Sequence, residues 1–135
     1  MSKDELSSEV RRFLYERVST YEQLEVLIWL AEHPEGAKLD VIESMLGASG
    51  VVAEEALTGL IEAGLVTRST RDGTYHYQPA DPELDSLTKQ LIRTYRASRF
   101  AVVKAMTDNS LQRLRGSTLH TFAECFLIGG PKKDG

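Results

Sequence analysis

The sequence predicts an α+β fold that is mainly helical, with one small β-hairpin. Apolar residues recur at helical spacing through most of the chain, whereas the alternation typical of strands is confined to two short segments around Asp72-Gly73. The 135 residues, 41% of them hydrophobic and 27% charged, are typical of one globular domain. We therefore expect the helices and the hairpin to share a hydrophobic core.

The N-terminal segment, residues 1–19, is predicted to hold a short amphipathic helix. Its apolar residues recur at helical spacing, with charged side chains between them: Leu6, Val10, Phe13, Leu14 and Val18. Ser19-Thr20 followed by Glu22-Gln23 then predicts a capping box at the start of a second helix. The buried stripe of that helix is expected to be Leu24, Leu27, Ile28 and Ala31.

A third helix is expected to begin near Asp40 and Glu43, which repeat the capping pattern. It ends at Leu46, because Gly47 suits the left-handed conformation that follows many helices. Residues 37–39, just before it, could form a short strand.

A fourth helix and the hairpin follow directly. Ser49 is the expected N-cap of this helix, and Gly64 is expected to end it in the left-handed conformation. We assign its inward side to Ala53, Leu57, Leu60 and Ile61. Asp72-Gly73 between two alternating segments predicts a two-residue hairpin turn.

The C-terminal part is predicted to consist of two helices. Asp81-Pro82 provides an N-cap and a first-turn proline for a long helix that runs to about Met106. Residues 107–110 are expected to break it, and a last helix begins at about Leu111. Trp29 and the aromatic residue Phe100 fall at helical spacing and are expected in the core.

The composition argues against several classes of function. Cys125 is the single cysteine, so the chain forms no internal disulfide, and a reducing cytoplasm fits best. The N-terminus lacks a signal-peptide pattern, and no apolar run reaches the ~20 residues that span a bilayer. The three histidines, His33, His76 and His120, lie far apart, and no nucleophile or phosphate-loop motif occurs. We expect no metal, no cofactor, no membrane contact and no enzymatic activity.

Charge is distributed unevenly along the chain. Residues 21–66 carry nine acidic side chains against one basic one, Lys38, whereas residues 67–135 carry eleven basic side chains against seven acidic ones. This asymmetry favours association between the halves, or with a protein partner, over nucleic-acid binding by the acidic half. The alternative is that the acidic residues only solvate helix surfaces.

The predicted order of elements over residues 20–79 resembles the winged helix-turn-helix of bacterial transcriptional regulators. Residues 46–66, LGASGVVAEEALTGLIEAGLV, are similar to the family pattern of Leu-Gly, a capping serine, paired core leucines and a closing Ala-Gly-Leu-Val. Residues 95–106 and 122–126 resemble the long helix and closing segment of small bacterial winged-helix proteins. The resemblance implies a winged-helix domain at 20–79 and a helical dimerisation or docking region at 80–128. The composition of residues 129–135, GGPKKDG, predicts a flexible tail.

The resemblance also implies DNA binding, with the fourth helix in the major groove and the hairpin, or wing, on the phosphate backbone. The predicted outward face of that helix is Val51, Val52, Glu54, Glu55, Ala56, Thr58 and Gly59. It contains no lysine or arginine, the residues that supply most phosphate and guanine contacts, and carboxylates repel phosphate. Wing contacts to DNA would come from Arg68, Arg71 and His76.

Basic residues also recur on one side of the long C-terminal helix: Lys89, Arg93, Arg96 and Arg99. They form either a solvated surface or a docking stripe for an acidic surface, which could belong to a second copy of the chain or to another protein. DNA phosphate is a third candidate.

The flanking helices carry more apolar surface than a lone winged-helix domain needs, so we predict a homodimer. Its candidate interface residues are Leu6, Val10, Phe13, Leu14, Leu91, Tyr95, Val102, Phe122 and Phe126. We expect a cytoplasmic, non-enzymatic regulatory protein that acts mainly through protein contacts, with auxiliary DNA contact by the wing and the basic stripe. A sequence-specific transcriptional regulator is one alternative, and a regulator that senses a small ligand between wing and long helix is another.

Overall fold

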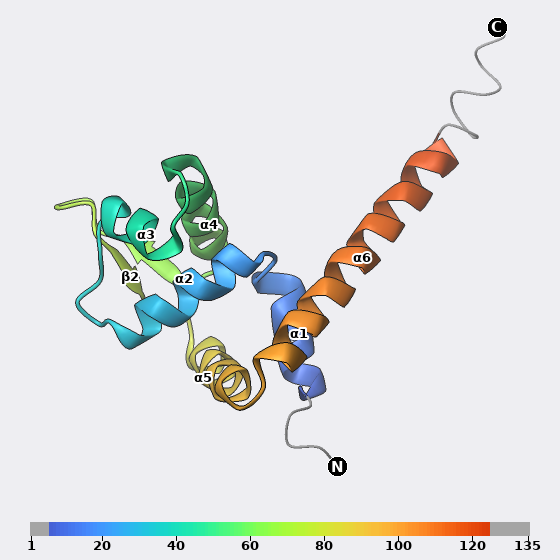
Figure 1. Ribbon diagram of the computed structural model, residues 1–135, viewed down its shortest axis with the longest axis horizontal. Helices are drawn as coiled ribbons and strands as arrows, with labels where there is room; N and C mark the ends of the chain where they lie inside the picture. Colours follow the sequence, from blue (N-terminus) through green and yellow to red (C-terminus); the bar gives the residue numbers. More distant parts are fainter. Residues whose placement is uncertain (1–5, 125–135) are drawn as a thin grey trace, which may run out of the picture.

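The computed structural model describes the backbone of residues 6–124 and the side chains of residues 6–115 (Figure 1). Its elements are α1 (Ser8–Arg17), α2 (Tyr21–Glu32), α3 (Leu39–Leu46), α4 (Gly50–Glu62), β1 (Val66–Arg68), β2 (Tyr75–Tyr77), α5 (Pro82–Ala97) and α6 (Arg99–Glu124). The part of the chain that the structure describes is mostly helical with one two-stranded antiparallel hairpin, which confirms the prediction of a mainly helical α+β fold. Among the described residues, no helix is both long enough and apolar enough to cross a membrane.

α2, α3 and α4 pack around one apolar centre, which the hairpin closes. The largest fully buried side chains there are Leu24, Leu27, Leu30, Ile42, Leu57 and Leu60. α2 begins as predicted, because the Thr20 hydroxyl accepts a hydrogen bond from the amide of Gln23 at 3.1 Å. The Gln23 side chain in turn accepts one from the amide of Ser19 at 2.7 Å. These reciprocal bonds fix the direction in which the chain enters α2.

The start of α3 differs from the prediction. Its N-cap is Lys38, which makes no side-chain capping bond, and Asp40 lies inside the first turn. The Asp40 carboxylate accepts from the neighbouring amide of Val41 at 2.9 Å, and it also places a negative charge at the positive end of the helix dipole. The end is as predicted, since Gly47 is left-handed with φ 65°.

α4 leads into the hairpin through a tight C-terminal turn. Gly64 has φ 79°, and the amide of Leu65 donates back to the carbonyl of Leu60 at 3.0 Å. Val66 then pairs with Tyr77 at the base of the hairpin. The short strand expected at residues 37–39 is reduced to one bridge, in which Ala37 exchanges backbone hydrogen bonds with Tyr75, because α3 already begins at Leu39.

The hairpin turn is longer than predicted. The amide of Ser69 donates to the carbonyl of Thr74 at 2.8 Å, so residues 70–73 form a four-residue loop. A two-residue type I′ turn needs positive φ at both central positions, and of Asp72 and Gly73 only the glycine has it, at 76°. The Asp72 carboxylate accepts from the hydroxyl and the amide of Thr74, and these bonds lower the pKa of Asp72.

The C-terminal helices divide at a different residue from the predicted one. α5 begins as expected, with the Asp81 carboxylate accepting from the amide of Leu84 at 2.9 Å. It ends at Ala97 instead of about Met106, and α6 continues without a break through residues 107–110. The cause is Ser98, which has extended backbone and whose hydroxyl accepts from the amide of Ala101 at 3.2 Å, so it caps a new helix.

α1 packs against α5 and α6 on the side of the molecule away from α3. The buried side chains in this layer include Val10, Leu14, Leu91 and Val102, and they join the same continuous core as the α2–α4 cluster. α6 then extends past α1 and away from the other elements (Figure 1).

Candidate interaction surfaces

The outward side of α4 combines exposed aliphatic and acidic side chains. Val51 is 65% exposed and Ile61 is 38% exposed, and Glu54, Glu55 and Thr58 between them are also exposed. We call these five residues the α4 face. Because α4 contains no lysine or arginine, this face presents carboxylates and apolar surface without any balancing positive charge.

Two residues assigned to the outward face from the sequence lie on the inner side of α4, and one assigned inward lies outside. Ala56 is only 3% exposed, and a Cβ at Gly59 would collide with the side-chain amide of Gln23 in α2. Ala53, Ala56, Leu57 and Leu60 therefore form the inner stripe at spacings of three and four residues, which turns Ile61 outward. Val52 is half-buried at the edge.

The N-terminus of α4 already has an acidic neighbour. The Ser49 hydroxyl accepts from the amide of Val52 at 3.5 Å, and the Glu43 carboxylate lies so close to Gly50 that a Cβ there would collide with it. A helix N-terminus attracts anions through its free amides and its dipole. Here a carboxylate of α3 occupies that environment, so a phosphate approaching it meets a negative charge.

The hairpin presents two exposed arginines and one packed histidine. Arg68 lies over the ring of Tyr75, 5.7 Å from its centroid, and Arg71 is at the exposed tip. His76, the third predicted wing contact, is half-buried against Gly36, where a Cβ would lie 2.5 Å from the imidazole. Gly36 has φ 77°, so its conformation and the contact both require glycine. The basic surface of the hairpin is therefore carried by the two arginines.

The predicted basic stripe covers α5 and the first residue of α6, and three of its four members have partners within the chain. Lys89 pairs with Asp85 at 2.9 Å, and Arg96 pairs with Glu32 of α2. Arg93 is exposed. Arg99 follows the break after α5, and its guanidinium lies over two tyrosine rings of the same chain. The Arg96–Glu32 pair joins the basic stripe to the acidic segment within one chain.

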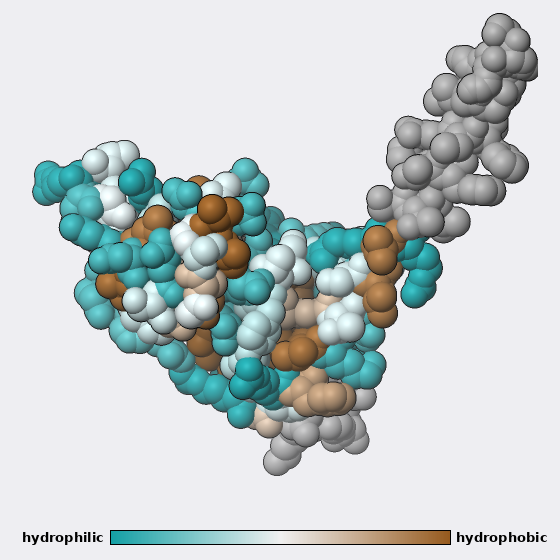
Figure 2. Space-filling view, turned by 45° about the horizontal axis from the view of Figure 1, so that its top comes forward, coloured by the Kyte–Doolittle hydropathy of each residue, from teal (hydrophilic) through white to brown (hydrophobic). Residues whose placement is uncertain are grey.

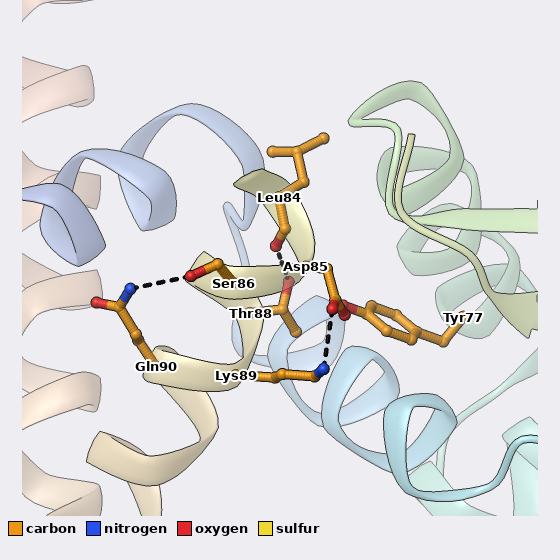
Figure 3. A network of polar contacts seen from close by, with 7 residues as sticks. All are labelled: Tyr77, Leu84, Asp85, Ser86, Thr88, Lys89 and Gln90. Carbon is orange, nitrogen blue, oxygen red and sulfur yellow. Dashed lines mark hydrogen bonds and ion pairs between the residues drawn. The ribbon is translucent and has the colours of Figure 1, made fainter. Parts of the chain in front are cut away.

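A hydrogen-bonded network joins β2 to α5 (Figure 3). The Tyr77 hydroxyl donates to the Asp85 carboxylate at 2.7 Å, and Lys89 contacts the same carboxylate. Both partners lower the pKa of Asp85, while burial raises the pKa of Tyr77. The buried hydroxyl of Thr88 donates to the carbonyl of Leu84 at 2.8 Å. The hairpin and α5 are thus joined by a direct hydrogen bond. One of the alternatives from the sequence places a ligand pocket between these two elements.

Most of the predicted dimer-interface residues are buried within the single chain. These are Leu6, Val10, Phe13, Leu14, Leu91 and Val102, each at most 7% exposed. Tyr95 is half-buried, with its hydroxyl 3.3 Å from that of Tyr21. The side chains of Phe122 and Phe126 lie outside the described residues. The apolar side of α1 finds its partners in α5 and α6 of its own chain, so these residues form core and not a free surface.

Several exposed apolar residues are absent from the sequence-based candidates. The most exposed are Val41 at 44%, Phe100 at 75%, Leu111 at 50% and Leu114 at 64%. Figure 2 shows apolar patches on an otherwise hydrophilic surface, including one on α6 next to the residues drawn grey. Phe100, expected in the core, points outward because Ser98 starts a new helix whose inner stripe is Val102, Ala105 and Met106.

The surface also contains shallow hollows. One of about 550 Å³ lies between α1 and α5, with Phe13, Leu84 and Leu87 among its lining residues and charged side chains around them. A smaller one of about 280 Å³ lies between the start of α2 and α6. Among the described residues, no group of three His, Cys, Asp or Glu side chains is placed to hold a metal ion.

Comparisons of the chain with protein-family models, with characterised proteins and with solved structures find no significant match.

Proposed function

We propose that the protein is a non-enzymatic winged-helix regulator, located in the cytoplasm as a homodimer, that acts mainly through protein contacts. The succession of α2, α3, α4 and the hairpin supports the winged-helix assignment, with α4 in the position of a recognition helix and β1–β2 in that of the wing. DNA contact is auxiliary and is made by the wing and the basic stripe.

The observation that carries the proposal is the composition of the α4 face. A recognition helix places its outward side chains against base edges between two rows of phosphates. In α4 those positions hold Glu54 and Glu55 between exposed Val51 and Ile61, and Glu43 lies beside the first turn. Carboxylates repel phosphate, whereas an apolar surface rimmed by charge is typical of protein interaction sites. The face therefore fits a protein partner with apolar and basic side chains.

The wing's share of the auxiliary DNA contact comes from Arg68 and Arg71. Each neutralised phosphate changes the logarithm of the affinity by about 0.9 per decade of salt concentration, and most of the affinity of non-specific binding comes from such contacts. Two exposed arginines on a short hairpin support few of them. Binding by the wing should be weak and strongly salt-dependent.

The test is a fluorescence anisotropy titration of labelled genomic DNA fragments at ~50 and ~200 mM salt. The wild type is compared with three double variants: Glu54→Gln/Glu55→Gln, Arg68→Ala/Arg71→Ala, and Glu9→Gln/Glu83→Gln as a matched control with two exposed acids outside α4. We expect weak binding without sequence preference, severalfold tighter in the α4 variant than in the control, and severalfold weaker in the arginine variant.

Tight binding that discriminates among sequences at the higher salt, and that is lost on Thr58→Ala or on the Glu54→Gln/Glu55→Gln change, would contradict the proposal. It would establish the alternative, a sequence-specific transcriptional regulator that reads DNA with α4.

A further inference from the structure

A small apolar hollow of about 150 Å³ opens on the surface between α2, α3 and α5. It is lined by Ile28, Trp29, Met45 and Tyr95, with Glu25 and Glu32 beside them. Trp29 is held in place by its stacking on His33, with ring centroids 3.7 Å apart, and His33 is fixed by a hydrogen bond to the carbonyl of Trp29. The hollow therefore has an aromatic wall held by these contacts, and its rim carries two carboxylates, of which Glu32 is paired with Arg96.

Phe100 is the most exposed large apolar side chain among the described residues, at 75%. It stands at the corner between α5 and α6, where Arg99 precedes it. Lys104 lies one helical turn further along α6 and pairs with Asp108 at 3.2 Å. Arg99 is oriented by Tyr21, whose hydroxyl accepts its hydrogen bond, and by the ring of Tyr95. We call Arg99, Phe100 and Lys104 the Phe100 wedge.

The wedge and the hollow complement each other in shape, polarity and charge. In other proteins an apolar cavity of about 150 Å³ accommodates one benzene molecule, so this hollow has the size for one phenylalanine ring. Arg99 beside Phe100 and Glu25 beside the hollow carry opposite charges, whereas Lys104 and Glu32 are already paired with Asp108 and Arg96 of the same chain. Aromatic residues, methionine and arginine are also the residue types enriched at protein interfaces.

Both surfaces are connected through the C-terminal part of α5. Tyr95 lines the hollow and also lies under Arg99 of the wedge. Each chain thus carries both halves of a complementary pair on one region of its surface, which is the requirement for a two-fold symmetric contact. We propose that two copies of the chain associate with the Phe100 of each inserted into the Ile28–Trp29–Met45–Tyr95 hollow of the other.

This inference rests on the homodimer of the proposed function and gives it an interface. It differs from a dimer through α1 and the inner side of α6, because the residues there are buried within the chain. It also differs from a contact along the outer part of α6, where Leu111 and Leu114 are exposed. The exposed outer part of α6 supplies a matched control, since Leu114→Asp introduces the same charge as Phe100→Asp on the same helix but outside the wedge.

The experiment is sedimentation velocity of the full chain from about 1 to 100 µM, a range in which association by mass action changes the dimer fraction. We expect a dimer whose dissociation constant rises at least about tenfold in Phe100→Asp and stays unchanged in Leu114→Asp. Phe100→Leu, which keeps an apolar side chain, should retain most of the association. Glu25→Arg should weaken it, because the new charge faces the positive wedge.

Each alternative outcome is decisive. A dimer that persists in Phe100→Asp and is lost in Leu114→Asp overturns the proposed interface while keeping the homodimer. A wild-type chain that stays monomeric over the whole range overturns both the interface and the homodimer. Phe100 is exposed, so the circular dichroism spectrum and melting temperature of Phe100→Asp should match those of the wild type, which separates lost association from lost folding.

Discussion

Two regions of the molecule have similar interiors and different surfaces. They are the α2–α4 cluster with its hairpin and the layer formed by α1, α5 and α6. Each buries a set of large aliphatic side chains, and the two sets form one continuous core. The outer surface of the first region is acidic on α4, whereas that of the second carries the basic side chains of α5. The flanking helices are therefore a second layer around the same core. Part of the opposite charge of the two regions is paired within the chain, in the Arg96–Glu32 ion pair.

Several polar contacts cross between these regions, and three of them differ in their exposure. Arg17 of α1 donates to the carbonyl of Ala63 at the end of α4, at 2.7 Å. Tyr77 of β2 donates to Asp85 of α5, and Arg96 of α5 pairs with Glu32 of α2. The first two contacts are partly buried, and the third is a surface ion pair. We therefore predict a graded series of losses in stability. Substitutions in the shared core should destabilise the protein most, and those at the exposed ion pair least.

Leu14→Ala in α1 and Leu60→Ala in α4 should each lower the free energy of unfolding by about 2–5 kcal/mol, because both side chains are fully buried. If the regions form one unit, either change shifts a single transition. Urea denaturation followed by circular dichroism and by the fluorescence of Trp29, the single tryptophan and a residue of α2, measures this.

Val41→Ala is the control, since this side chain is exposed and should alter stability little. The conclusion that both regions unfold together would be wrong if Leu14→Ala shifted the transition seen by circular dichroism but left the midpoint of the Trp29 fluorescence transition unchanged. In that case α1, α5 and α6 would unfold as a separate unit.

Arg17→Met should come next, with a loss of about 1–2 kcal/mol. Its guanidinium satisfies a carbonyl at the C-terminus of α4, where a cation also interacts favourably with the helix dipole. Methionine keeps most of the apolar stem, so the difference reports the polar contact. Thermal unfolding of Arg17→Met beside Arg12→Met, whose guanidinium pairs only with its helix neighbour Glu16, measures the effect. Equal stability of the two variants would mean that the crossing contact contributes nothing.

The elements that the sequence predicts well are those determined by neighbouring residues. The cap at Thr20, the left-handed Gly64 and the start of α5 at Asp81 each depend on side chains within a few positions of the helix end. The wrong predictions concern features that also depend on contacts between distant parts of the chain. Apolar spacing across Ser98 is compatible with one helix or with two, because a serine can lie inside a helix or cap one; here its hydroxyl caps α6, and α5 and α6 both pack against α1.

The candidate surfaces show the same limit. The acidic character of α4 follows directly from its residues, but the inner position of Ala56 depends on how closely α2 approaches. An apolar stripe on α1 indicates burial without identifying the partner, so the sequence alone does not distinguish an interface between chains from a core within one chain. The exposure of Phe100 depends on the break at Ser98 and could not be predicted without it.

Tyr77→Phe should lower the free energy of unfolding by about 1 kcal/mol, since it removes one partly buried hydrogen bond and little volume. The bond holds the pKa of Asp85 below its ordinary value of 3.8 in the folded state. Its contribution is therefore present above that value and is lost as the pH falls through the lower folded-state pKa. Urea titrations of both proteins at about pH 7 and about pH 3 should show the difference shrinking at the acidic pH. A difference that is constant with pH would show that Asp85 is not the partner.

Arg96→Gln should have the smallest effect of the series, although it removes an ion pair that joins α5 to α2. The side chains of Arg96 and Glu32 are 63% and 37% exposed, and pairs in such surroundings contribute about 0–1 kcal/mol because water and salt screen them. A double-mutant cycle with Glu32→Gln at low salt and at about 1 M salt isolates the pair, and we expect a coupling that vanishes at high salt.

Arg93→Gln, an exposed neighbour on α5, is the control. If the coupling instead exceeded the Tyr77→Phe effect and persisted at high salt, charge attraction between the acidic and basic segments would be a principal link between the two regions. The order of the series would then be set by charge and no longer by burial.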